Sequence, residues 1–173
     1  MQSLLLLVAT LWVGSLWTLG YIVAPTLFAT LADRSLAGSI AGALFRVEAW
    51  LSLACAGVML IVLLQRKVGS KAEDETGFEV SREAGNRAGR EAGHAGDRQR
   101  TVLLRIVLAM AVCTLIGYFG LQPMMASLRE AGAASGGMTA ETRKAFGLLH
   151  GIAAVVFFIQ SLLGVSLMLK LKH

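Results

Sequence analysis

Four long stretches of this chain carry no Asp, Glu, Lys or Arg, and they constrain its fold more than any other feature. They are residues 1–32, 49–65, 106–128 and 145–169. An α-helix that crosses the hydrocarbon core of a bilayer needs about 20 consecutive, mostly apolar residues. Three stretches reach this length directly, and the second reaches it once its amphipathic entry at residues 43–48 is included. The sequence therefore predicts transmembrane helices over about residues 3–30, 44–65, 103–125 and 143–169.

The composition supports a single all-α membrane domain that covers residues 1–173. Hydrophobic side chains make up 55% of the chain, charged ones only 16%, and the mean hydropathy is +0.66. These values lie outside the range of soluble domains and predict a four-helix bundle embedded in the lipid bilayer. A cleaved signal peptide explains residues 1–32 less well, because such peptides begin with positive charge and have an apolar stretch of only about 7–15 residues.

Basic residues are distributed unequally between the two ends of the predicted bundle. With four spans, both termini and the connection at 66–100 share one side, which also carries Arg105, Lys170 and Lys172. Eight further Lys and Arg residues lie in that connection, against five on the opposite side. Because Lys and Arg accumulate in cytoplasmic loops, we expect both termini in the cytoplasm and a multi-pass protein of the cell inner membrane.

The segment at residues 68–100 differs from the rest of the chain. It repeats Ala-Gly between charges and has almost no apolar side chains, so we expect a flexible, charged cytoplasmic loop, disordered or loosely helical. The net charge of +5 does not indicate nucleic-acid binding. The loop mixes acidic with basic side chains and lacks the aromatic residues on which bases stack.

His150 is the one titratable residue that interrupts the apolar character of the last span. It lies five residues past Ala145, about 8 Å below the outer boundary of the span. Polar groups buried in hydrocarbon need partners, and ionisable residues within spans usually face the interior and mark function. We therefore expect His150 to face an outward-opening polar pocket in the outer half of the bundle. The other expected pocket residues are Tyr21 on the first helix, Arg46 and Glu48 at the mouth of the second, and Tyr118 and Gln122 on the third.

Each of these residues also has a structural interpretation. A single histidine can donate one hydrogen bond to a neighbouring helix and fix the bundle, and Arg46 and Glu48 can extend from the membrane interface towards water. Met124 and Met125, together with His150, are candidate ligands for a soft metal such as copper. Methionine equally fills gaps between helices. The residues alone do not choose between these alternatives.

Small residues at helical spacing predict contacts between helices. Gly14 and Pro25 lie on one face of the first span, where Pro25 removes a backbone hydrogen bond and should kink the helix. Gly147 and Gly151 lie one turn apart around His150. In a bilayer such faces allow helices to approach closely, within the chain, in a homo-oligomer or with a membrane partner.

Two motifs support a family resemblance. The segments "GSLWTLGYIVAPTLFATLADRSLAGSIAGALFRVEAW" and "FGLLHGI" resemble the bacterial membrane family that has a transmembrane-protein-205-like domain. This resemblance implies a four-helix integral membrane protein and supplies no reaction. The residues that match its motifs are Gly14, Pro25, Phe28, Phe45, Arg46, Glu48 and His150.

The layout is more distantly similar to the copper-resistance D proteins and the HemJ-type protoporphyrinogen oxidases. In both, histidine takes part in metal or haem chemistry. The first span has no histidine where the HemJ type has one. With a single intramembrane histidine, bis-histidine haem ligation within one chain is excluded.

These observations favour binding or passage of a small ligand or metal at the pocket around His150. A haem- or metal-linked membrane oxidoreductase and a structural or assembly subunit of a membrane complex are the alternatives. The sequence has no metalloprotease, phosphate-loop, nucleophile-elbow or haem-attachment motif, which argues against an enzyme. It identifies no cofactor.

Overall fold

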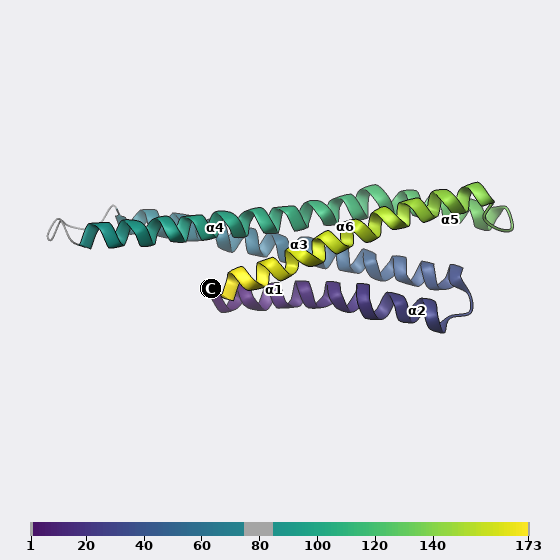
Figure 1. The fold of residues 1–173 in the computed structure, drawn as a ribbon, viewed down its shortest axis with the longest axis horizontal. Coiled ribbons are helices and arrows are strands. Elements are labelled where there is room, and N and C mark those ends of the chain that lie inside the picture. The colour runs from purple at the N-terminus through teal and green to yellow at the C-terminus, as the bar shows by residue number, and fades with distance from the viewer. Residues whose placement is uncertain (1, 75–84, 173) are drawn as a thin grey trace.

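The computed structural model describes the backbone of residues 2–74 and 85–172 and the side chains of residues 2–65 and 96–172. Over these residues the chain is an all-α, four-helix membrane bundle, as predicted (Figure 1). Its elements are α1 (Gln2–Trp17), the π-helix η1 (Thr18–Val23), α2 (Ala24–Thr30), α3 (Arg34–Asp74), α4 (Gly85–Leu115), the π-helix η2 (Ile116–Leu121), α5 (Gln122–Ala134) and α6 (Ala140–Lys172).

Four helical segments are long and apolar enough to cross a membrane, which makes this a multi-pass membrane protein. They are Gln2–Thr30, Arg34–Gln65, Gly96–Ala134 and Ala140–Lys172. The second begins well before the expected residue 44, because Asp33 caps it. The Asp33 carboxylate accepts hydrogen bonds from the backbone N–H groups of Ser35 and Leu36, at 2.8 and 3.3 Å. The region before residue 44 is thus a continuous part of the helix.

The two ends of the bundle differ. The hairpin end carries the turns at residues 31–33 and 135–139, and the terminus end carries the first residues of α1 and the last residues of α6 (Figure 1). At the terminus end the side-chain amide of Gln2 donates to the backbone oxygen of Leu171 at 2.6 Å. The backbones of α3 and α4 extend beyond this end, to Asp74 and from Gly85. The centre of the predicted flexible loop, residues 75–84, lies outside the described residues, and its flexibility stays a prediction.

A π-helical turn precedes each proline of the chain. Pro25 follows η1 and Pro123 follows η2. Proline has no backbone N–H and its ring clashes with the carbonyl of the preceding turn. A π-helical turn inserts an extra residue into the helix and so accommodates both effects without ending the helix. At Pro25, where the sequence predicts a kink, the structure has this π-helical turn.

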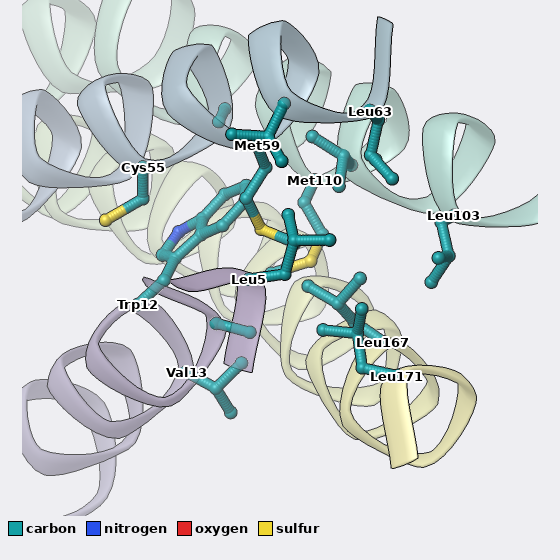
Figure 2. Close-up of a cluster of buried hydrophobic side chains, with 14 residues drawn as sticks. Leu5, Trp12, Val13, Cys55, Met59, Leu63, Leu103, Met110, Leu167 and Leu171 are labelled. Atoms are coloured by element: carbon teal, nitrogen blue, oxygen red, sulfur yellow. The ribbon is translucent and has the colours of Figure 1, made fainter. Parts of the chain in front are cut away.

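The apolar core occupies the terminus half of the bundle. It is built from side chains of all four spans: Leu5, Ala9, Trp12, Val13, Cys55, Ala56, Met59, Val62, Leu63, Leu103, Val107, Met110, Leu167 and Leu171 (Figure 2). In the hairpin half, by contrast, η1 and α2 bury no residue, and the buried residues of α6 begin only at Gln160. The core therefore closes one half of the bundle, and the hairpin half is more open.

Candidate functional site: a polar layer in the middle of the bundle

All buried polar side chains of the described residues lie near the middle of the bundle, at the edge of the apolar core. They are Glu48, Ser52, Thr114, Gln160 and Ser161. Hydrogen bonds connect them to Trp12, Ser15 and Tyr21 of the first span. We call these eight residues the polar layer. Its members come from all four spans, so the layer crosses the whole bundle.

Glu48 is the ionisable residue at the centre of this layer. The residue is only 6% exposed. It lies 14 residues from Arg34 and 17 from Gln65, the two ends of the helical segment. At 1.5 Å per residue it is more than 20 Å from either end, near the middle of this segment. The helix begins at Arg34, ten residues before the expected start of the membrane span at residue 44, and the position of Glu48 at the mouth of that span stays a prediction.

Two serine hydroxyls converge on one oxygen of the Glu48 carboxyl group. Ser15 Oγ on α1 and Ser52 Oγ on α3 both donate to Oε1, each at 3.2 Å. The indole N–H of Trp12 donates to Ser52 Oγ at 2.8 Å. An indole N–H can only donate, so Ser52 accepts from Trp12 and its own proton is directed to Glu48. Ser15 Oγ also lies 3.0 Å from the backbone oxygen of Trp12, a second acceptor for the same proton.

The other carboxyl oxygen, Glu48 Oε2, has a different environment. It accepts none of the hydrogen bonds formed among the described residues. Across the same residues, no fully buried side-chain nitrogen or oxygen lacks a hydrogen-bond partner. Oε2 therefore retains accessible surface. No Lys, Arg or His of the described residues forms an ion pair with this carboxyl group.

Two further hydrogen bonds connect helices through the polar layer. Tyr21 donates from its hydroxyl to Ser161 Oγ at 3.2 Å, which joins η1 to α6. The side-chain amide of Gln160 donates to Thr114 Oγ1 at 3.0 Å, which joins α6 to α4. Polar side chains of this kind stabilise helix pairs in a membrane. Helix pairing is a sufficient explanation for the burial of the neutral side chains in the polar layer.

Aromatic rings cover the layer on the side of the hairpin end. The ring of Phe157 lies against Tyr21 and Phe45, with centroid distances of 5.5 and 6.3 Å. The same ring occupies the space where a Cβ on Gly20 would be. Gly20 is therefore the glycine that allows α6 to approach the first span here. Gly14, expected in that role, has no other side chain within 4 Å of an added Cβ.

The remaining predicted pocket residues lie outside the polar layer and have contacts of their own. Gln122 is half-buried, and its side-chain amide donates to the backbone oxygen of Gly42 at 3.1 Å. Tyr118 packs edge-on against Trp50, with a centroid distance of 6.1 Å. Arg46 is exposed. Of the six residues predicted to share one pocket, only Tyr21 and Glu48 belong to the polar layer.

His150 lies on α6 in the open hairpin half of the bundle. Its ring is exposed and stacks on Phe146 of the same helix, with a centroid distance of 6.2 Å and an interplanar angle of 8°. His150 lies seven residues before Phe157, so the two rings are on the same face of α6. That the imidazole faces the bundle interior stays a prediction. Gly147 and Gly151 have no neighbouring atom within 4 Å of an added Cβ. A role for His150 in ligand binding stays a prediction.

Gly147 and Gly151 line a shallow apolar groove on α6. Its lining residues are Gly147, Leu148, Gly151, Ile152, Val155 and Val156, all from α6. The described residues contain no group of three or more His, Cys, Asp or Glu side chains placed to hold a metal ion. Met124 is exposed and Met125 half-buried. Metal binding by His150, Met124 or Met125 stays a prediction.

A family model described as a domain of unknown function, DUF4149, matches residues 7–134. The chain belongs to this family. The DUF4149 match covers the first three spans and includes Trp12, Ser15, Glu48 and Ser52, the whole hydrogen-bonded group around the carboxyl. No curated protein and no solved structure matches the chain. The resemblances to the transmembrane-protein-205-like, copper-resistance D and HemJ-type proteins stay predictions.

Trp12, Ser15 and Ser52 were not among the residues predicted to surround Glu48. One signal was present in the sequence: Trp12 and Ser15 are three residues apart and Glu48 and Ser52 four apart, so each pair lies on one helix face. Spacing along one helix does not show which faces of different helices meet, so the contact itself required the packed structure.

Proposed function

We propose that this DUF4149 protein binds a small monovalent cation, the proton included, at Glu48 in the middle of the membrane. One observation carries the proposal: Glu48 is only 6% exposed, and its carboxyl group has no ion-pair partner among the described residues. A charged side chain at the bilayer centre costs at least about 2.5–3.5 kcal/mol, and such residues usually belong to ion or proton pathways. A bound cation removes that cost.

The surroundings of Glu48 are suited to a small hard cation. The carboxyl group and the hydroxyls of Ser15 and Ser52 supply oxygen ligands, and Oε2 retains accessible surface. The apolar core closes the terminus half of the bundle, whereas the hairpin half buries few residues. We therefore infer entry from the hairpin end. In the orientation that the basic residues predict, this end faces outwards from the inner membrane.

The proposal keeps the predicted activity, binding or passage of a small ligand, and moves its centre from His150 to Glu48. His150, Arg46, Tyr118 and Gln122 then become candidates for the approach to the site in the hairpin half. An assembly subunit is the second candidate function. The exposed groove around Gly147 and Gly151 favours it, because small residues allow another helix to pack closely.

Thermal unfolding in mild detergent tests the cation site. The wild-type chain and Glu48→Gln are compared in NaCl, in KCl at the same ionic strength, and across a pH series. We expect one of the three cations, Na⁺, K⁺ or H⁺, to raise the unfolding midpoint of the wild type and not that of Glu48→Gln. A ligand at 100 times its Kd stabilises by about 2.7 kcal/mol.

Glu130→Gln is the matched control, since Glu130 is exposed at the hairpin end and should respond like the wild type. If the unfolding midpoints of the wild type and Glu48→Gln differ by the same amount in every salt and at every pH, Glu48 binds none of these cations and the proposal is overturned.

A further inference from the structure

We infer that the cation bound at Glu48 is a proton, carried on Oε2, so that the resting site is a neutral carboxylic acid. This inference rests on the proposed function and narrows it. The two serine hydroxyls divide the carboxyl group into an oxygen that accepts hydrogen bonds and an oxygen that accepts none. A carboxylic acid has the same division, because one oxygen is a carbonyl acceptor and the other holds the proton.

The hydrogen-bond directions support this assignment. Because the indole N–H of Trp12 donates to Ser52 Oγ, the Ser52 hydroxyl directs its own proton to Glu48 Oε1. A buried carboxylate can accept at both of its oxygens, with about four lone-pair positions, and its burial is tolerated only when donors satisfy them. Here Ser15 and Ser52 share Oε1, and no described residue donates to Oε2. In a carboxylate, Oε2 would carry part of the negative charge without a hydrogen-bond donor. In a carboxylic acid, Oε2 holds the proton instead, which fits this arrangement.

No titratable or cationic side chain on the surrounding helices neutralises Glu48. The first span has only Tyr21, whose hydroxyl is bonded to Ser161. Between residues 145 and 169 α6 has only His150, which is exposed, stacks on Phe146 and forms no ion pair with Glu48. On α3 the nearest such residues are Arg46, which is exposed, and Cys55, which is buried two turns away. The third span has Cys113 and Tyr118 between residues 106 and 128. The described residues therefore supply no neutralising charge, which leaves a proton or cation from the surroundings to do so.

A proton fits this site better than a metal cation does. Hard metal ions in proteins are surrounded by about six or more oxygen ligands. Around Glu48 the hydrogen-bonded side-chain oxygens are only two serine hydroxyls, both within 3.2 Å of Oε1. A proton needs a single oxygen. Oε2 has accessible surface through which that proton can be exchanged.

Labelling with the hydrophobic reagent dicyclohexylcarbodiimide tests the inference, because a carbodiimide reacts with a protonated carboxylic acid. The acid proton moves to a carbodiimide nitrogen, the carboxylate oxygen adds to the central carbon, and an acyl shift leaves a stable N-acylurea. The full chain is reconstituted in phospholipid vesicles, labelled across a pH series that includes neutral pH, and mapped by mass spectrometry. Glu130 and Glu141 serve as internal controls, since both are exposed at the hairpin end.

We expect Glu48 to be labelled at neutral pH, where carboxyl groups in water are ionised, and Glu130 and Glu141 to remain unlabelled. Labelling of Glu48 should decrease at least tenfold as the pH is raised and the proton is lost. The Glu48→Gln chain should lose this label and should still fold, because its amide replaces a neutral acid of the same shape.

Two results overturn the inference. One is a Glu48 that stays unlabelled at every pH at which the chain remains folded. The other is a label that does not decrease with rising pH. If either occurs while Na⁺ or K⁺ still stabilises the wild type and not Glu48→Gln, the cation site stands and its ligand is the metal ion. If no cation distinguishes the two chains, the proposed function fails as well.

Discussion

The indole N–H of Trp12 donates to Ser52 Oγ across 2.8 Å and joins α1 to α3 where the apolar core meets the polar layer. Both side chains are almost completely buried, at 0% and 1% exposure. Figure 2 shows the Trp12 ring among the core side chains of the other helices. One bond therefore anchors the largest core residue and also sets the direction in which Ser52 donates. Packing and the chemistry at Glu48 are coupled through this pair.

Replacing Ser52 with alanine should destabilise the chain. The Ser52→Ala change leaves the Trp12 indole N–H without an acceptor and removes one donor to Glu48. An unsatisfied buried polar group costs about 1–3 kcal/mol, so we expect a lower unfolding midpoint in detergent. Ser39→Ala is the control, because Ser39 is exposed on the same helix and should change the midpoint little. Equal midpoints for the two variants would show that the Trp12–Ser52 bond contributes nothing.

Two glycines of the first span should respond oppositely to alanine. The Gly20→Ala change places a Cβ in the space of the Phe157 ring and should cost about 1–3 kcal/mol. The Gly14→Ala change meets no neighbouring atom within 4 Å and should be neutral or stabilise by up to about 1 kcal/mol. Unfolding midpoints of the two variants test whether Gly20→Ala is the less stable one. A more stable Gly20→Ala would contradict the close approach of α6.

The hydrogen bond between Gln160 and Thr114 should give a measurable coupling energy between α6 and α4. A double-mutant cycle with Gln160→Leu and Thr114→Val isolates it, because each change removes one partner of the 3.0 Å bond. Interhelical hydrogen bonds in membrane proteins contribute about 0.6 kcal/mol on average and at most about 1.7 kcal/mol. Additive effects of the two changes would show that the bond does not couple the helices.

Removing the imidazole of His150 should leave the stability of the isolated chain nearly unchanged. The ring is exposed and its one ring contact is with Phe146 of its own helix, so His150→Ala should shift the free energy of unfolding by less than about 0.5 kcal/mol. Equilibrium unfolding in detergent measures this, with Phe157→Ala as a destabilising control. A large loss of stability for His150→Ala would restore the role of His150 as a lock between helices.

A reporter fused between residues 80 and 95 tests the predicted orientation. This segment lies in the connection that carries eight Lys and Arg residues, so a reporter that is active only in the cytoplasm should be active there. Fusion in the turn at residues 135–139 provides the opposite control. Activity of a periplasmic reporter at residues 80–95 would reverse the topology.

The sequence could predict the number and character of the spans because the bilayer imposes a simple physical rule. Long uncharged stretches must be helical, since hydrocarbon offers no partner for backbone N–H and C=O groups. The same rule does not reveal where a helix begins outside the apolar stretch. The segment before Glu48 contains Arg34 and Arg46, so charge content places the apolar span only from about residue 44, whereas the helix begins at Arg34.

The sequence by itself determined the four spans, the all-α fold and the polar residues available to a site, because these depend on composition and spacing along one helix. Only the tertiary structure decided which of those residues meet. It joined Glu48 to Ser15 through the packing of α1 on α3, and it left His150 exposed because the hairpin half of the bundle is open. Periodicity defines a face of a helix, but the partner of that face depends on how the other helices cross it.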